Sequence, residues 1–267
     1  MTPSMPVVFV SHGAPDALLK APDTVGCWRK IGMRIPEPQG ILVVSAHWQA
    51  SVPTVSLAAA PETIHDFSGF SPELHQMRYP APGAPALAER TMWLLSSAGI
   101  HAARHPNRGL DHGAWVPLSV MLPRAHIPVT QLSLTRQGAA DHFALGRALF
   151  PLRDEGILIV ATGAITHNFG WLDWRASNTS PPLPKALAFA DWVGEQLAAQ
   201  NAPALMNYRT APYGAEAHPS EDHILPLFVA LGAAGNDRPE QYRPSFTYGG
   251  LAMDAYGWGF TSNTSNP

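Results

Sequence analysis

The stretch VVFVSHG (residues 7–13) predicts a buried strand, because a run of β-branched and aromatic residues ends directly in a histidine and a glycine. The stretches ILVVSAH (residues 41–47) and ILIVATGAITH (residues 157–167) repeat this arrangement. Short apolar runs bounded by glycine and proline are typical of buried strands. We therefore predict strands at residues 7–10, 41–45, 54–57, 129–134 and 157–161.

Segments with helical spacing of apolar residues lie between and after these runs. They cover residues 84–98, 139–152, 184–200 and 223–232. The alternation of strands and helices predicts an α/β fold, in which helices flank a central mixed or mostly parallel β-sheet. The sequence contains no internal repeat, and the polar stretch 175–184 is typical of a surface loop before a helix. We therefore expect residues 1–267 to form a single domain.

Composition argues against several classes of partner. The formal net charge of −3 and the pI near 6.4 leave no basic stripe for a nucleic-acid backbone. The longest apolar runs are far shorter than the roughly 20 residues of a membrane-spanning helix. The single cysteine, Cys27, cannot form an internal disulfide, and no apolar leader segment precedes the first strand. We expect a cytoplasmic protein with no nucleic-acid or membrane partner.

Three histidines follow three of the predicted strands. His12, His47 and His167 each lie just past the carboxyl end of an apolar run. Ligand sites of open α/β sheets gather at that edge. Neutral imidazole is a common ligand for divalent metals, and three ligands from separate elements leave coordination positions open for catalysis. Alternatively, each histidine is an ordinary polar residue at a strand end that bonds a loop carbonyl.

A fourth histidine lies in AHPSEDHILPL (residues 217–227), directly before an apolar helix. One interpretation is a helix N-terminus, with Ser220 or Asp222 as the capping residue. That interpretation does not explain His223, because a cationic imidazole is unfavourable at the positive end of a helix. A metal-ligating histidine is neutral and is acceptable there.

The stretch HPNRGLDHGAWVPL (residues 105–118) places Asp111 and His112 in a glycine-rich turn. His112 could act as an acid/base or as a hydrogen-bond donor to a developing negative charge, and Asp111 could simply cap the next helix. Trp48, next to His47, could form a wall for an aromatic substrate.

The same segments resemble the class III extradiol ring-cleaving dioxygenases, in the branch related to DOPA 4,5-dioxygenase. The resemblance covers almost the whole chain and rests on five motifs in the family's order, namely VVFVSHGAPDALL, ILVVSAHW, LDHGAWVPLSVMLP with the following IPVTQLSL, IVATGAITHNF and AHPSEDHILPLFVALGAAG. It implies the fold of the protocatechuate 4,5-dioxygenase β subunit.

The resemblance also implies roles for individual residues. His12, His47 and His223 become the metal ligands. His167 becomes the active-site acid/base or a fourth ligand at rest, and His112 becomes a base that either lies behind the metal ligands or faces the substrate.

Branches of the family differ in the type of residue that serves as the third metal ligand. Protocatechuate-type relatives use a carboxylate there, whereas the DOPA-type branch uses histidine, so Glu221 and Asp222 stay as fallback ligands for His223. His218 is a weaker competitor, and we assign it, with Trp48, to substrate binding.

The function that the resemblance implies is cleavage of a catechol-type, DOPA-like ring with O2 by a single catalytic domain that is a monomer or a homodimer. The expected cofactor is one divalent metal ion per chain, Fe(II) for ring cleavage, with Zn(II) plausible in the isolated protein. Two alternatives stay open. One is a zinc-binding hydrolase that uses metal-bound hydroxide, and the other is a non-catalytic, Memo-like binding module.

Overall fold

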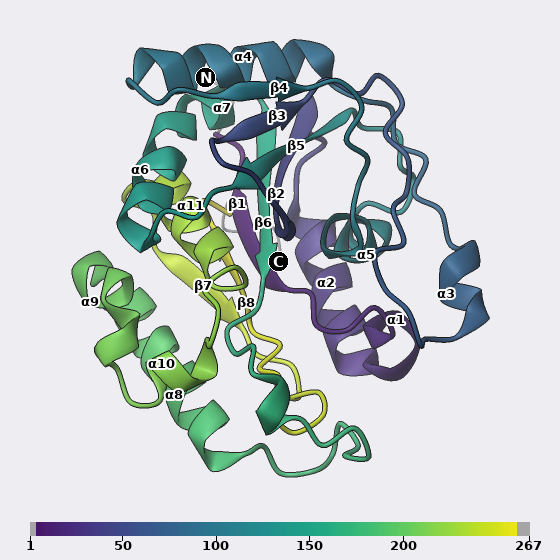
Figure 1. The fold of residues 1–267 in the computed structure, drawn as a ribbon, viewed down its shortest axis with the longest axis vertical. Coiled ribbons are helices and arrows are strands. Elements are labelled where there is room, and N and C mark those ends of the chain that lie inside the picture. Colours follow the sequence, from purple (N-terminus) through teal and green to yellow (C-terminus); the bar gives the residue numbers. More distant parts are fainter. Residues whose placement is uncertain (1–3, 261–267) are drawn as a thin grey trace, which may run out of the picture.

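The computed structural model describes residues 4–260, and its centre is an eight-stranded sheet with the order β4-β3-β5-β2-β6-β1-β8-β7 (Figure 1). The strands are β1 (Val7–Ser11), β2 (Gly40–Gln49), β3 (Thr54–Ser56), β4 (Ala103–His105), β5 (Val129–Leu134), β6 (Ile157–Gly163), β7 (Pro239–Tyr242) and β8 (Ala255–Trp258). The helices are α1 (Ala17–Lys20), α2 (Pro22–Arg34), α3 (Pro72–Gln76), α4 (Pro85–Ser97), α5 (His112–Met121), α6 (Ala139–Leu149), α7 (Pro151–Asp154), α8 (Pro184–Ala198), α9 (Ala202–Met206), α10 (Gly214–Ala217) and α11 (Leu225–Ala234). The 3₁₀ turns are η1 (Phe169–Trp171) and η2 (Tyr208–Thr210).

The predicted α/β fold with a mixed, mostly parallel sheet is confirmed. β6 lies between β1 and β2 and is parallel to both, and β5 extends this parallel block on the other side of β2. Antiparallel pairs join β1 to β8, β8 to β7 and β3 to β5. The parallel block brings the carboxyl ends of β1, β2 and β6 to one edge of the sheet, where open α/β sheets bind ligands.

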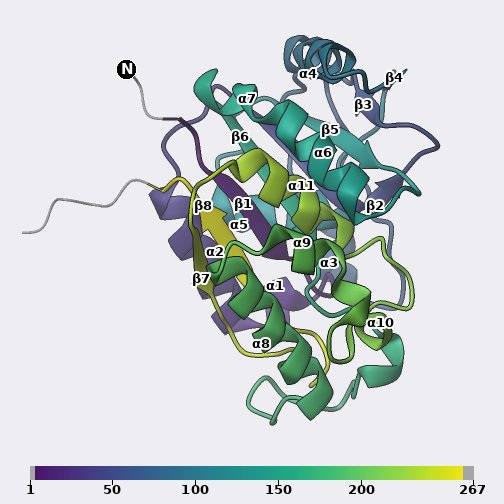
Figure 2. The ribbon, with the colours of Figure 1, turned by 90° about the vertical axis from the view of Figure 1, so that its left-hand side faces the viewer.

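Helices cover both faces of the sheet, and side-chain alternation along the strands divides the core between them. Val7 and Phe9 of β1 pack into the cluster on the side of α6 and α11, whereas Val8 and Val10 pack into the cluster that contains α2 and α5. Figures 1 and 2 show α6 and α11 together on one side of the sheet, and Figure 1 shows α2 and α5 on the opposite side. Both faces of the central strands are therefore buried, which explains their continuous apolar runs.

Several elements depart from the sequence prediction. The helix predicted at residues 139–152 is divided into α6 and α7, because Pro151 cannot donate to the preceding turn and instead begins a new helix. The helix predicted from residue 223 begins at Leu225. Strands β4, β7 and β8 and helix α2 were not predicted, and α5 was expected only as a helix that Asp111 could cap.

His47 is not past the end of its strand, as predicted, but inside it. β2 pairs with β6 up to Ser45 and rejoins β5 only at Gln49, with a shift in register between Val44 and Gln49. Such an irregularity re-aims side chains near the end of a strand. It lets the strand continue past His47 while that side chain still reaches the ligand edge.

Within residues 4–260, none of the helices combines the length and the apolar character that a bilayer crossing requires.

Replacement of each of two glycines in α2 by alanine should change the free energy of unfolding in opposite directions. A Cβ atom on Gly32 would overlap the backbone of Met121 in α5, whereas a Cβ atom on Gly26 would meet nothing within 4 Å. We expect Gly32→Ala to lower the free energy of unfolding by about 1–3 kcal/mol, because the two helices must separate. We expect Gly26→Ala to raise it by about 0.4–1 kcal/mol, because alanine restricts the unfolded chain.

Urea denaturation of both variants measures these changes. Because the two glycines belong to one helix, helix propensity is matched between them. Equal shifts of the unfolding midpoint in one direction would contradict the close α2–α5 contact.

Candidate metal centre

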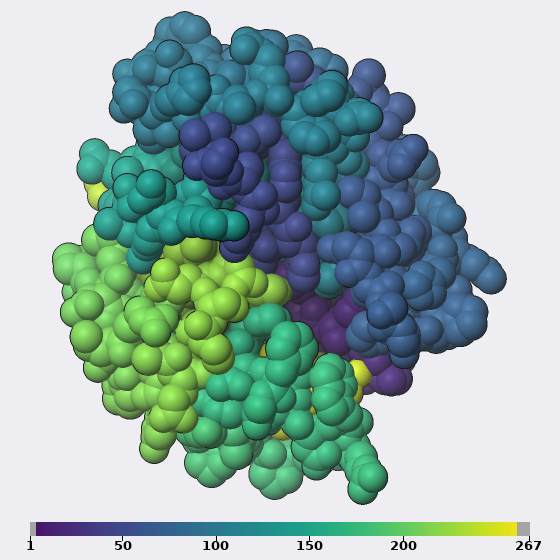
Figure 3. Space-filling model, viewed as in Figure 1, coloured from purple at the N-terminus to yellow at the C-terminus, as the bar shows by residue number. Residues whose placement is uncertain are grey.

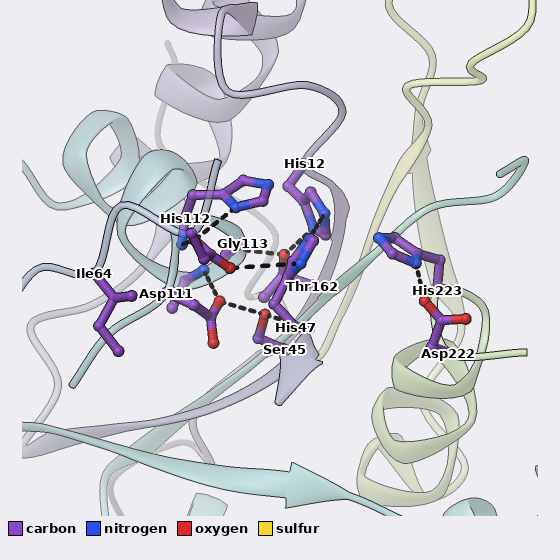
Figure 4. A network of polar contacts seen from close by, with 12 residues as sticks. His12, Ser45, His47, Ile64, Asp111, His112, Gly113, Thr162, Asp222 and His223 are labelled. Carbon is purple, nitrogen blue, oxygen red and sulfur yellow. Dashed lines mark hydrogen bonds and ion pairs between the residues drawn. The ribbon is translucent and has the colours of Figure 1, made fainter. Parts of the chain in front are cut away.

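Five histidines from separate elements meet at the ligand edge of the sheet. They are His12, directly after β1, His47, near the end of β2, His112, the first residue of α5, His167, in the loop after β6, and His223, just before α11. Figure 4 shows His12, His47 and His112 side by side, with His223 facing them from the other side. The convergence that the strand-end pattern predicts is therefore present.

His12, His47 and His223 have the geometry of ligands to one ion. Each offers a nitrogen, and the three nitrogens lie within 4.8 Å of one another. The Nε2 atoms of His12 and His47 are 2.9 Å apart. Two nitrogens that each lie about 2.1 Å from one ion at angles of 90–109° are about 3.0–3.4 Å apart, so the spacing suits a shared divalent metal.

The ring orientation of His12 is fixed by Thr162. The Thr162 hydroxyl donates its only hydrogen to the carbonyl oxygen of Gly113 at 2.7 Å. Its oxygen must therefore accept from Nδ1–H of His12, also at 2.7 Å. This chain of hydrogen bonds leaves the Nε2 lone pair of His12 free for a metal.

The ring of His223 is oriented in the same way by its neighbour Asp222. The carboxylate of Asp222 accepts a hydrogen bond from Nδ1 of His223, as Figure 4 shows. Asp222 is thus not the cap of the following helix, because the N-cap of α11 is Ile224 and has no side-chain hydrogen bond. A carboxylate that bonds the outer nitrogen of a metal-ligating histidine also makes that histidine a better donor.

Burial keeps the three imidazoles neutral. Desolvation is the largest cause that lowers the pKa of His12, His47 and His223, and the neighbouring imidazoles lower it further. Asp222 opposes this shift of the His223 pKa without reversing it. Because metal binding requires a deprotonated nitrogen, the site is set for a cation at neutral pH without any proton having to leave.

Asp66 is a functional residue that the sequence analysis missed. One oxygen of its carboxylate accepts from both the backbone N–H and Nδ1 of His112, at 3.0 and 2.9 Å. Its other oxygen lies 3.6 Å from Nδ1 of His47. Burial works to raise the pKa of Asp66, but the hydrogen bonds and the electrostatic interaction with His112 outweigh it and lower this pKa overall. Asp66 therefore stays ionised and directs Nε2 of His112 away from itself.

His167 lies flat against His223. The two rings are parallel within 7°, with centroids 3.4 Å apart. Burial is the main cause that lowers the pKa of His167, so this ring is also neutral and able to accept a proton. A second group of potential ligand atoms combines His167, Asp222 and His223, so the geometry is compatible with either role considered for His167.

Two predicted substrate contacts lie elsewhere. Trp48 follows His47 in a strand, so its side chain points to the opposite face, where it packs edge-on against His105 and near Arg108. His218 is fully buried, bonds the carbonyl oxygen of Ile165 and contacts Tyr208. Neither residue lines the cavity at the histidine cluster.

The start of α5 is fixed to β2 by a compact polar network. Asp111 caps α5 by accepting from Ala114 N–H, as one of the two interpretations of that motif predicts, and also accepts from the hydroxyl of Ser45. A Cβ atom on Gly113 would collide with Ser45 and with the ring of His47. Glycine is therefore required where α5 touches the ligand strand, and this contact sets the distance between His112 and His47.

Comparisons with known proteins agree with this geometry. Residues 3–259 match the family model described as the catalytic LigB subunit of aromatic ring-opening dioxygenase. The chain is 41% identical over 239 residues to the 4,5-DOPA dioxygenase extradiol of Escherichia coli (strain K12), covering 88% of this chain and 87% of that protein. It is 40% identical over 262 residues to the 4,5-DOPA dioxygenase extradiol of Beta vulgaris, covering 93% and 94%.

A solved structure has the same fold. The crystal structure of an uncharacterized protein from Escherichia coli K12 superposes with a TM-score of 0.78 at 36% identity, and the match covers 95% of this chain and 99% of that one.

Removal of the Thr162 hydroxyl should weaken the metal centre specifically. In Thr162→Val, Nδ1–H of His12 loses its acceptor and the tautomer of the ring is no longer fixed. We expect about 10–100-fold weaker binding of Zn(II), measured by competition with a chromophoric chelator.

Thr130→Val is the matched control, because Thr130 is also a buried strand threonine whose hydroxyl donates to a carbonyl, that of Ser56. It should lose stability but keep its affinity for Zn(II). Equal affinities of wild type and Thr162→Val would show that Thr162 does not orient the ligand.

Proposed function

Because this chain belongs to the family of catalytic LigB subunits of aromatic ring-opening dioxygenases, in its DOPA-type extradiol branch, we propose that it opens a catechol ring with O2 at one divalent metal ion held by His12, His47 and His223. The chain is an extradiol ring-cleaving oxidoreductase. The observation that supports the metal centre best is the convergence of three neutral imidazoles whose nitrogens lie within 4.8 Å of one another.

We further propose that residues 1–267 act as one catalytic domain. In support, β8 pairs with β1, so strands from both ends of the chain belong to one sheet. The relatives favour ring opening over the zinc hydrolase and over the Memo-like binding module, since the curated relatives named above are called dioxygenases.

The proposed native ion is Fe(II), because an ion that exchanges electrons with O2 supplies the redox chemistry that ring opening requires. Zn(II) fits the same three nitrogens but has no redox chemistry. His12, His47 and His223 would hold the ion and, as only three protein ligands, would leave it open to the substrate.

His112 and His167 are the proposed proton acceptors. Nδ1 of His112 bonds the Asp66 carboxylate, which leaves Nε2 as the atom that takes a phenolic proton from the substrate. His167 borders the same cavity from the opposite side, stacked on His223. We propose that these two imidazoles hold and return the protons that the catechol releases when it binds.

The five histidines should separate into two groups by metal content. We expect alanine variants of His12, His47 and His223 to lose bound metal, because each removes one of only three ligands. We expect His112→Ala and His167→Ala to retain metal and to lose turnover by about 10²–10⁴-fold, the usual contribution of a general base.

Metal analysis of the purified variants by plasma mass spectrometry, together with oxygen uptake, tests this division. His101→Ala, at an exposed position, is the control for loss of an unrelated histidine. Metal loss in His167→Ala equal to that in His12→Ala would assign His167 to the ligands.

Metal exchange tests the redox requirement. Protein loaded anaerobically with Fe(II) should consume O2 and a catechol in equal amounts, whereas protein loaded with Zn(II) should consume neither. An oxygen electrode measures uptake, and the absorbance of the ring-opened product measures cleavage. If iron-loaded protein consumed O2 with none of a panel of catechols, the proposed function would be refuted.

A further inference from the structure

The cavity in front of the histidine cluster has a volume of about 320 Å³. A cavity of about 150 Å³ is enough to hold benzene inside another protein. The present cavity is about twice as large, so it has room for a catechol ring and for a substituent of similar size. The chemistry of its walls therefore decides which substituents are accepted.

Aromatic side chains border the cavity on both sides of the histidines. Phe67 stands edge-on to His112, with ring centroids 5.7 Å apart, and Phe70 packs against Phe67. On the other side, Phe169 stands 5.1 Å from His167, and Trp174 lines the rim beyond it. Figure 3 shows the two segments involved, blue around residue 70 and green around residue 170, bordering the same region of the surface.

Within residues 4–260, the cavity lining contains no lysine, arginine, aspartate or glutamate. Its polar residues besides the histidines are Ser68 and Asn168. The amide of Asn168 is already engaged, because it donates to the carbonyl of Glu216 and accepts from Gly170 N–H. Ser68 is exposed at the rim.

The nearest charged side chains are occupied or face solvent. Asp66 bonds His112 and Asp222 bonds His223. Arg108 donates to the carbonyl of His47 and to Asp111. Arg175, which follows Trp174, is exposed and does not line the cavity. A substrate carboxylate buried in the cavity would thus lose water without gaining a partner of opposite charge, which is unfavourable.

We infer that the preferred substrates are catechols whose ring substituent is uncharged and apolar, such as an aryl or alkyl group, and not amino-acid catechols. This inference rests on the proposed ring cleavage at the same site. The inferred substrate preference differs from the substrate in the names of the relatives, because DOPA carries both a carboxylate and an ammonium group. The aromatic walls would instead stack on a second ring or an alkyl chain.

Binding tests the preference without turnover. Zn(II)-loaded protein is titrated under argon with 4-phenylcatechol, with 3,4-dihydroxyphenylpropionate, with dopamine and with DOPA, by calorimetry. We expect 4-phenylcatechol to bind on the order of 100-fold more tightly than the three charged catechols, because only it buries no unpaired charge. Equal or tighter binding of any charged catechol would overturn the inference.

Two rim variants sharpen the test. Phe169→Arg adds a cation at the cavity and should strengthen binding of 3,4-dihydroxyphenylpropionate by about tenfold, as a new carboxylate partner does. Trp93→Arg is the matched control, since Trp93 is similarly exposed, 57% against 68% for Phe169, but lies on α4 away from the cavity. If both variants changed this binding equally, the apolar rim would not determine the preference.

The variant Arg175→Ala tests whether Arg175, the remaining cation near the cavity, pairs with a substrate carboxylate. Its discrimination between 4-phenylcatechol and 3,4-dihydroxyphenylpropionate should equal that of wild type, and a larger discrimination would show that Arg175 serves as a carboxylate partner, against the inference. The same catechols are then supplied with O2 to Fe(II)-loaded protein. Absence of cleavage refutes the proposed function, whereas the order of affinities alone decides the substrate preference, so the two failures are distinguishable.

Discussion

The proposed metal centre depends on the outer nitrogens of its imidazoles having acceptors, because only then do the inner lone pairs converge on one point. Nδ1–H of His12 donates a hydrogen bond to the hydroxyl oxygen of Thr162, and this hydroxyl donates to the carbonyl oxygen of Gly113. Nδ1–H of His223 donates to the carboxylate of Asp222. Burial completes the arrangement by keeping the rings neutral. Thr162 can do this because β6 lies between β1 and β2, so one residue of the middle strand reaches the end of the strand that carries His12.

The second constraint is the close approach of α5 to β2. The ring of His47 and the hydroxyl of Ser45 occupy the space that a Cβ atom on residue 113 would fill, so this position requires Gly113. Asp111, which caps α5, also accepts a hydrogen bond from the Ser45 hydroxyl. The helix therefore delivers His112 to the cavity in a fixed position, where Asp66 orients its ring. Core packing and the proposed proton transfer thus depend on the same few residues at one helix terminus.

The sequence predicted the layers of the fold and the convergence of histidines, because strand periodicity and the ligand edge of parallel sheets are local rules with a general cause. It did not predict Asp66, which lies in a loop without periodicity and meets His112 only through tertiary packing. Trp48 and His218 were assigned to the substrate by proximity in sequence. The alternation of strand side chains and the burial of His218 place both outside the cavity. The edge strands β4 and β7, and β8 next to β7, have only three or four residues each, so their sequence pattern is weak.

The position of β6 also determines when the centre can assemble as the chain leaves the ribosome. His12 and His47 are made early, but β1 and β2 are not neighbours in the sheet, and the strand that separates them comes much later. His223 emerges later still. A nascent chain that ends before β6 therefore leaves both edges of β1 and one edge of β2 unpaired, and it contains only two of the three proposed ligands. Binding of the proposed ion would follow this late, non-local insertion, and the early strands would be exposed to aggregation until then.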